Sequence, residues 1–423
     1  MANTLRRPRR TRSADDPPAD TGTGVGTGLL LLMSAATGLA VAGNYVAQPL
    51  LEVIGRELGL STVTAGLVVT AAQVGYALGL ILVLPLGDLL ERRGLAVGLL
   101  VATAGFLLVA GAAPNGAVLL AGTLLTALTS VAAQVLVPFA VALAEPERRG
   151  RVVGTVMTGL LLGGLLARTA SGALAELSGW RTVYWVDAVL VLAVALLLWR
   201  RLPRLRTGVN AAYPALLAST LALFRHEPVL RWRAGIGALS MASFNVLWTA
   251  VAFLLAGPGY GWSEAAIGLF GLVGVAGALT TPFAGRLADR GLVQAVSGTG
   301  TAMLAVSWIA IGAGGGSLGW LLGGTLVLNV AQYAVLNGNQ NVIYALRPEI
   351  RNRLNSAFMT AFFAGGAAGS ALAAVVWASA GWTGVSVLGG TLAAGTFALW
   401  ALERAAARSA RSARGPADAR SER

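Results

Sequence analysis

Twelve apolar stretches, each long enough to cross a lipid bilayer as a helix, dominate this chain. A helix needs about 20 predominantly apolar residues to cross ~30 Å of hydrocarbon, and 56% of the residues are hydrophobic while 12% are charged. We expect the spans at residues 27–50, 63–86, 95–113, 117–143, 152–177, 182–199, 233–255, 265–284, 293–314, 318–345, 355–378 and 383–402. The sequence therefore predicts an all-α membrane protein with twelve transmembrane helices.

The arginines predict how these helices are oriented. All 31 basic residues are arginine, and 28 of them lie before the first span, after the last span or in alternate connections. Basic residues collect on the cytoplasmic side of membrane proteins. We therefore expect a multi-pass protein of the cell inner (plasma) membrane with both termini in the cytoplasm. The same bias explains the net charge of +13, so we expect no nucleic acid partner.

The spans and their connections predict five regions. These are a disordered cytoplasmic arm (1–26), an N-terminal six-helix half (27–199), a cytoplasmic inter-half loop (200–232), a C-terminal six-helix half (233–402) and a basic cytoplasmic tail (403–423). The loop contains YPALLASTLALF, which fits either an amphipathic helix at the membrane surface or a plain linker.

The two halves repeat each other at a fixed offset. The segment PERRGR at 146–151 recurs as PEIRNR at 348–353, 202 residues later. At the same offset, Met157, Thr158, Gly163, Gly164, Gly179 and Trp180 recur as Met359, Thr360, Gly365, Gly366, Gly381 and Trp382. Such internal repeats are typical of transporters, and the fold is expected to be a six-plus-six duplication.

The connections after the second and eighth spans resemble a motif of the major facilitator superfamily, G-x-L-x-D-R-x-G-R-R. The second half keeps it as Gly285, Leu287, Asp289, Arg290 and Gly291. The first half keeps Asp88, Arg92 and Arg93, with Leu84 and Glu91 where the motif has glycine. The resemblance covers about residues 27–402. It implies two pseudo-symmetric halves, and it implies that these loop residues latch the cytoplasmic side in the outward-facing state.

Four further segments resemble a bacterial exporter branch of that superfamily. They are NYVAQPLL (44–51), GYALGLILVLPLGD (75–88), RRGRVVGTVMTGLLLGGLLART (148–169) and RLNSAFMTAFFAGGAAGS (353–370). This branch is related to drug:proton antiporters and includes sugar and purine-nucleoside exporters. The sequence departs from the antiporter pattern twice: the glycines of the fifth span lack a proline, and the fourth span has Gln134 and no arginine.

One cation, Arg168, lies deep inside the fifth span, where a charge costs about 2.5 to 3.5 kcal/mol on insertion scales. It is about 24 Å from Val152 at ~1.5 Å per residue. Asp187 lies about 7.5 Å from the outer end of the sixth span by the same rise, so the two reach similar depths. They form either a structural ion pair, or a functional group in which Arg168 faces the cavity, holds an anionic or polar substrate group or exchanges partners with Asp187.

Polar side chains recur along several other spans, most regularly along one face of the tenth. The expected substrate and coupling residues, besides Arg168 and Asp187, are Asn44, Gln48, Gln73, Tyr76, Gln134, Asn245, Trp248, Asn329, Tyr333 and Asn337. Together they predict a neutral cavity of amides and aromatic rings for a moderately polar organic molecule. Each of them alone is equally consistent with hydrogen bonding between helices.

The sequence thus predicts a secondary active transporter that exports a small organic molecule, drug-like, sugar or nucleoside, by alternating access. An importer or facilitator of the same fold and a non-transporting membrane receptor are the alternatives. We expect no enzyme, because Asp187 is the one acid of the spans that lies clearly below the membrane interface and the spans hold no histidine and no cysteine, too few groups for acid–base or metal chemistry. We expect no metal and no cofactor, a proton gradient as the candidate energy source, and a monomer whose partners are the lipid bilayer and the substrate.

Overall fold

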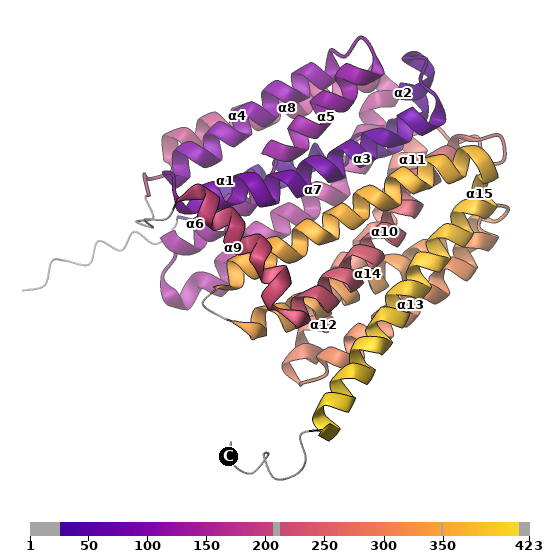
Figure 1. Ribbon diagram of the computed structural model, residues 1–423. Coiled ribbons are helices and arrows are strands. Elements are labelled where there is room, and N and C mark those ends of the chain that lie inside the picture. Colours follow the sequence, from indigo (N-terminus) through magenta and orange to yellow (C-terminus); the bar gives the residue numbers. More distant parts are fainter. Residues whose placement is uncertain (1–25, 206–211, 348–349, 414–423) are drawn as a thin grey trace, which may run out of the picture.

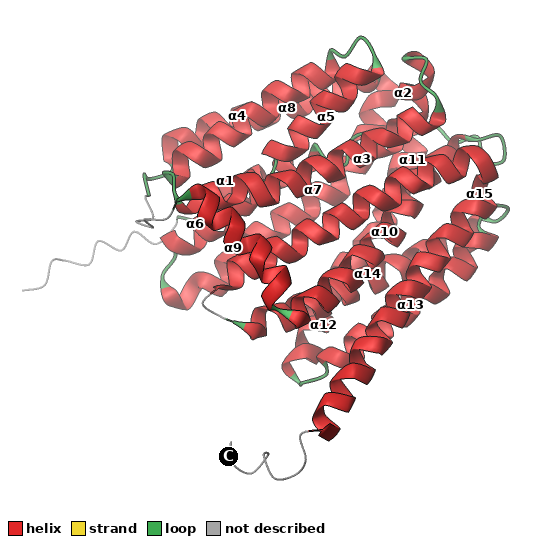
Figure 2. Cartoon of the chain, in the orientation of Figure 1, coloured by secondary structure: helices red, strands yellow, loops and turns green. Residues whose placement is uncertain are grey.

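The computed structural model describes residues 26–205, 212–347 and 350–413 and is built from helices (Figure 2). In the described part, ten helices are long and apolar enough to cross a membrane. The last of these, Arg351–Ser409, reverses direction at Gly381 and so crosses twice (Figure 1). The shorter apolar segment Thr27–Ala42 begins one more crossing. The predicted all-helical fold with twelve crossings is confirmed.

The first six crossings are not all single helices. In chain order they are α1 (Thr27–Ala42) with η1 (Gln48–Leu50) and α2 (Leu51–Glu57); α3 (Thr62–Leu78) with the π-helical η2 (Gly79–Val83) and η3 (Leu84–Asp88); α4 (Arg92–Gly111); α5 (Gly116–Thr129) with α6 (Ala132–Leu143); η4 (Pro146–Arg148) with α7 (Arg149–Ser178); and α8 (Trp180–Arg201). The breaks in the first and fourth crossings, at residues 43–47 and 130–131, lie where the sequence predicts continuous spans.

The second six crossings follow the same plan. They are α10 (Pro228–Ala256); α11 (Glu264–Phe270) with η5 (Gly271–Val273) and α12 (Gly274–Asp289); α13 (Val293–Ala313); α14 (Leu318–Leu346); and the two arms of α15 (Arg351–Ala413). Helix α10 begins at Pro228, five residues before the predicted start of the seventh span.

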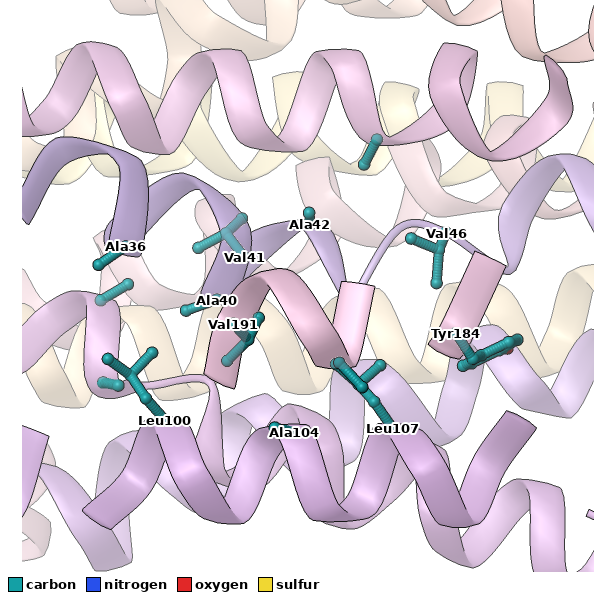
Figure 3. Close-up of a cluster of buried hydrophobic side chains, with 14 of the residues drawn as sticks. Ala36, Ala40, Val41, Ala42, Val46, Leu100, Ala104, Leu107, Tyr184 and Val191 are labelled. Atoms are coloured by element: carbon teal, nitrogen blue, oxygen red, sulfur yellow. The ribbon is translucent and has the colours of Figure 1, made fainter. Parts of the chain in front are cut away.

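The core of the first half is formed by small side chains of α1 against larger ones of its neighbours. Figure 3 shows Ala36 and Ala40 of α1 near Leu100 of α4 and Val191 of α8, in one buried cluster. The outer face of α8 is apolar but exposed, and Val189 is 64% exposed. Large exposed apolar side chains of this kind require a lipid surface around the bundle.

The duplication is visible in the backbone. Gly179 and Gly381, 202 residues apart, have φ of 81° and 57°, a region that glycine adopts most easily. Each marks the turn between two crossings. Gly163 lies directly against the backbone of Gly38, and its counterpart Gly365 lies in the same way against Ala238.

The two halves meet along two helix pairs. On one side, α3 follows α15 over most of its length, with hydrogen bonds from Ser356 Oγ to Leu80 O at 2.9 Å and between the hydroxyls of Thr70 and Ser370 at 2.9 Å. On the other side, α7 contacts α11 through Gly172, which touches the backbone of Glu264. We call the end of the bundle that carries this α7–α11 contact the opposite end. The termini end is the one at which α1 begins and α15 ends.

On the side of α7, the halves separate toward the end that carries the termini. Residues 158, 165 and 172 lie two helical turns apart on one face of α7. Gly172 is buried against α11 and Leu165 packs against Gly274, but Thr158 is exposed. The face of α7 that is covered at the opposite end is therefore uncovered at the termini end.

The loop between the halves contains the helix α9 (Tyr213–His226), which packs on the protein through Leu216 and Thr220. The Tyr213 hydroxyl donates to Leu82 O at 2.5 Å, and α9 also contacts α10 and α15. Of the two alternatives for this loop, the structure shows a helix, and it bridges both halves. The predicted arm up to residue 25 and the tail from residue 414 lie outside the described residues.

Candidate functional site

Arg168 is the centre of the candidate site. It lies on α7, is 6% exposed, and its Nε donates to Gln48 Oε1 at 2.6 Å. Its Nη1 donates to Gly164 O at 3.3 Å, which ties the side chain to its own helix. The break between α1 and η1 is what places the Gln48 amide within reach.

Two aromatic rings, one from each half, contact the guanidinium of Arg168. Its Cζ lies 4.6 Å from the ring centroid of Tyr45 and 4.4 Å from that of Trp248 on α10. Rings at this distance stabilise a cation through their π faces. Gly271 of the second half lies against the Arg168 side chain. The cation therefore lies at the interface between the halves. The sequence-based alternative in which Arg168 faces the cavity requires this position.

Asp187 lies elsewhere, and the ion pair predicted from depth alone is not formed. No salt bridge joins it to Arg168 among the described residues. Its Oδ2 is buried, has no hydrogen-bond partner and faces Gly43 inside the first half. Depth follows from the rise of ~1.5 Å per residue, but direction depends on rotation about the helix axis and on packing. The rotation of α7 and α8 about their axes directs Arg168 and Asp187 away from each other.

Other predicted residues of the first half bond to neighbours within that half, and one pair of predicted residues meets across the halves. Asn44 donates to Ser130 Oγ at 3.0 Å, across the breaks in the first and fourth crossings. Gln134 donates to the Tyr76 hydroxyl at 3.2 Å. Gln73 and Asn245, from opposite halves, both border Gly366.

The polar face of α14 is satisfied largely by its own helix. Asn329 and Asn337 donate to the backbone oxygens of Thr325 and Tyr333, each at 2.8 Å. Tyr333 packs against Gly277 of α12. Asn329 and Tyr333 therefore both lie against α12 within the second half, and Asn337 lies two helical turns beyond Asn329 on α14.

A narrow cavity adjoins Arg168. It has a volume of about 10 Å³ and is lined by Gln48, Pro49, Arg168, Trp248, Val251, Ala252, Ile267 and Phe270. This is about the space that one water molecule needs, so the wet pocket predicted from the polar stripes is nearly closed at this point. The indole Nε1 of Trp248 is buried without a hydrogen-bond acceptor.

A larger cavity of about 160 Å³ lies toward the opposite end. It is lined by Glu52, Arg56, Trp262 and Glu264, among others, and it shares Pro49 and Ile267 with the cavity at Arg168. Pro49 and Ile267 therefore lie between the cavity at Arg168 and the larger cavity toward the opposite end.

The gating loops are engaged within their own half. Arg92 Nη1 donates to Pro138 O at 3.3 Å, and the Arg93 guanidinium lies 4.4 Å from the Trp199 ring. Asp88 ends η3. In the second half, a side chain at Gly285 would meet open space and Arg290 is exposed, while the Asp289 side chain lies outside the described part. Among the described side chains, neither Arg92 nor Arg93 bonds to the second half.

Glu91 replaces a motif glycine because it caps α4. Its carboxylate accepts from the backbone N–H groups of Arg93 at 2.7 Å, Gly94 at 2.8 Å and Leu205 at 3.2 Å. Burial raises the pKa of Glu91, but these three donors and the charge of Arg93 outweigh it, so the pKa is lowered. The same carboxylate thus anchors the chain that follows α8.

Sequence reasoning missed Tyr45 and Phe270, which contact the guanidinium and line its cavity respectively. Tyr45 lies between Asn44 and Gln48, both of which the sequence singles out, so its position was a usable signal. Phe270 is one apolar residue in an apolar span, and its sequence context carries no comparable signal.

The chain also resembles known proteins over most of its length. The family profile described as Major Facilitator Superfamily matches residues 33–343. The putative uncharacterized transporter YgaY of Escherichia coli K12 is 49% identical over 372 residues, which cover 88% of this chain and 94% of YgaY. The chloramphenicol resistance protein of Streptomyces lividans is 28% identical over 286 residues, 67% of this chain and 72% of that protein.

The fold matches solved transporter structures as well. A bacterial homologue of the human lysosomal transporter Spinster superposes with a TM-score of 0.72 at 16% identity, over 90% of this chain and 96% of that one. The profile match, the relatives and the twelve-crossing fold with its internal duplication agree. This chain is therefore a membrane-spanning transporter that belongs to the major facilitator superfamily.

Proposed function

We propose that this protein exports a small organic molecule by alternating access, and that Arg168 binds an anionic or strongly electron-rich group of it. The proposal places the protein in the inner (plasma) membrane with both termini in the cytoplasm. A drug-like molecule, a sugar acid or a nucleoside derivative with a carboxylate or phosphate meets this description.

The observation that carries the proposal is a buried cation at the interface of the halves that has no counter-ion among the residues that the structure describes. The partners of Arg168 are an amide oxygen, a backbone oxygen and two aromatic rings. None of these neutralises its charge, and a charge buried in a membrane protein usually has a partner or a function. An anion bound there would supply the missing charge.

The hydrogen-bonding groups around the cavity favour the same class of ligand. Trp248 Nε1 is a donor without an acceptor, and indole can only donate. The guanidinium beside it also only donates. Two adjacent donors are matched by a group with two acceptor oxygens, and charge-assisted bonds of this kind are about twice as strong as neutral ones.

The arrangement of the halves supports alternating access. The opposite end is closed by the contact of α7 with α11, while the face of α7 at Thr158 is uncovered. A site between the halves, reached from one end at a time, is the general design of such transporters.

Proteoliposomes containing the purified protein test this function. We would measure uptake of benzoate, a carboxylate probe, and of chloramphenicol, chosen because of the relative from Streptomyces lividans, with and without an imposed proton gradient. Accumulation that follows the gradient, with benzoate preferred, is the expected result. Absence of protein-dependent flux for both probes and for a panel of sugars and nucleosides would contradict it.

A facilitator of the same fold is the second candidate. The observations that favour it are the uncharged fourth crossing, with Gln134 bonded to Tyr76, and the absence of proline from α7. Equilibration of benzoate at a rate that the proton gradient does not change would select this alternative.

A further inference from the structure

A second group of buried polar side chains lies inside the first half, outside the Arg168 site. Asp187 and Tyr184 project from one face of α8, three residues apart, and Thr123 and Thr126 are three residues apart on α5. All four are less than a tenth exposed. The Thr126 methyl group and Asp187 Oδ2 both lie against Gly43, which brings α5 and α8 together at this point.

The oxygens of this group are not all satisfied by the protein. Asp187 Oδ2 and Thr126 Oγ1 are buried without a hydrogen-bond partner among the described residues, and Tyr184 Oη and Thr123 Oγ1 are buried close to each other. A single unpartnered oxygen would be unremarkable in a bundle of this size, but a buried carboxyl group whose Oδ2 has no partner, beside three buried hydroxyls, is costly unless something binds there.

No described residue forms an ion pair with Asp187; on its own helix, α8, Arg181 pairs with Glu57, and Arg200 and Arg201 lie at the far end. Helices α1 and α5 carry no titratable residue, and those of α4 are Arg92 and Arg93 at its first turn. On α7, Arg168 is directed to the interface and Glu176 lies near the helix end. Tyr45, which follows α1, also faces Arg168. An ionised carboxylate without a partner is far less stable in such a site than the neutral acid.

The broken segment of the first crossing, residues 43–48, connects this group to the Arg168 site. Its first residue, Gly43, contacts Asp187, and its last, Gln48, accepts the hydrogen bond from Arg168. Between them, Asn44 is bonded to Ser130 and the Tyr45 ring covers the guanidinium. A displacement of this segment at one end therefore changes contacts at the other.

We propose that Asp187, with Tyr184, Thr123 and Thr126, forms the site at which the driving proton binds, and that residues 43–48 couple it to the Arg168 site. The proton is taken up by the carboxylate and later released to water, with no other bond made or broken. The direction of coupling rests on the proposed export function: export against an inward proton gradient requires exchange, so substrate binding must release the proton.

Infrared difference spectroscopy of the purified protein tests the proton site without any ligand. We expect a carbonyl band of a buried protonated carboxylic acid that disappears at alkaline pH. Asp187→Asn should abolish the band, and the matched control Glu52→Gln, at an exposed acid of the same half, should retain it. If Asp187→Asn does not fold, Thr126→Val, which keeps the acid and changes its surroundings, should shift the band. A band that neither variant changes overturns the proposal. The proposal is also overturned if sodium stabilises the wild type but does not stabilise Asp187→Asn.

Proton release on adding benzoate, followed with a pH dye in weakly buffered detergent solution, tests the coupling. The wild type should release protons and Asp187→Asn should not, although it still binds benzoate. If bound benzoate only attracted a proton to a nearby group, the protein would take up protons on binding. Proton uptake or an unchanged pH therefore contradicts the coupling. Failure of benzoate and chloramphenicol to bind the wild type would count against the proposed function, while the infrared result would still decide the proton site.

Discussion

At the scale of single residues, Arg168 combines features that are rarely found together. It is buried, it holds a hydrogen bond at 2.6 Å to Gln48, and rings from both halves cover it, yet no described residue serves as its counter-ion. Arginine suits this position better than lysine because its planar group can stack on rings and still donate at its edges.

Arg168→Lys should therefore keep the charge but lose most of the binding. We expect benzoate affinity to fall about 10-fold or more for this variant and for Arg168→Gln, since a charge-assisted hydrogen bond contributes roughly 1.5 to 3 kcal/mol. Isothermal titration calorimetry of the purified variants measures this. Arg181→Gln, at an exposed ion pair with Glu57, is the matched control; equal affinity in all four proteins would remove Arg168 from the site.

Trp248→Phe separates the stacking role of the indole from its role as a donor. The phenyl ring still covers the guanidinium, but the unpartnered Nε1 is gone. Loss of one neutral hydrogen bond, about 0.5 to 1.5 kcal/mol, predicts a fall in benzoate affinity of roughly 2- to 10-fold. The same titration with Trp199→Phe, at the Arg93 contact, provides the control. Unchanged binding by Trp248→Phe would show that the indole N–H does not contact the ligand.

The sequence predicts which residues form the site better than it predicts which of them contact each other. Arg168, Gln48 and Trp248 were all expected, and the structure brings them together. The pairing of Arg168 with Asp187 was wrong because residue spacing gives depth along a helix, whereas rotation and the tilt between α7 and α8 depend on the packing of the whole half.

At the scale of helices, contacts through glycine determine how the bundle is assembled. Gly163 lies on Gly38 where α7 crosses α1, and Gly365 lies on Ala238 where α15 crosses α10. The repeat of these glycines was readable from the sequence. The breaks at residues 43–47 and 130–131 were not, because apolar composition continues through them and their irregular backbone depends on contacts with other crossings.

Gly163→Ala should destabilise the protein, because the added methyl group would overlap the backbone of Gly38. Overpacking of this kind costs about 1 to 3 kcal/mol. Gly154→Ala on the same helix is the matched control, since its methyl group would meet open space and alanine favours a helix by roughly 0.5 to 1 kcal/mol. Thermal unfolding in detergent, followed by tryptophan fluorescence, should rank Gly154→Ala at or above wild type and Gly163→Ala below it. The reverse order would contradict the crossing.

Glu91→Ala should loosen the start of α4 and the segment at Leu205 together. Loss of a helix cap costs about 0.5 to 2 kcal/mol. Because the folded-state pKa of Glu91 is lowered, its contribution is present above the unfolded value of ~4.3 and is lost as the pH falls through the lower folded value. Unfolding curves at pH 7 should therefore separate wild type from Glu91→Ala, and curves in strong acid should converge. A difference that does not depend on pH would contradict the role of the carboxylate.

At the scale of the whole molecule, the fold was predictable and the conformation was not. Span length, the arginine bias and the 202-residue repeat specify two six-helix halves. Which end is open depends on small differences between contacts, such as α7 on α11 at Gly172 and the uncovered face at Thr158, and these are properties of the assembled halves.

The most direct test of the account measures both ends of the bundle at once. The natural chain has no cysteine, so spin labels can be placed cleanly at Thr158→Cys with Gly285→Cys for the termini end, and at Leu177→Cys with Gly259→Cys for the opposite end. Pulsed electron–electron double resonance would measure the distance between the two labels of each pair, with and without benzoate. The account predicts that benzoate shifts populations so that the termini-end distance shortens while the opposite-end distance lengthens. Two distances that stay fixed, or that change in the same direction, would contradict alternating access around Arg168.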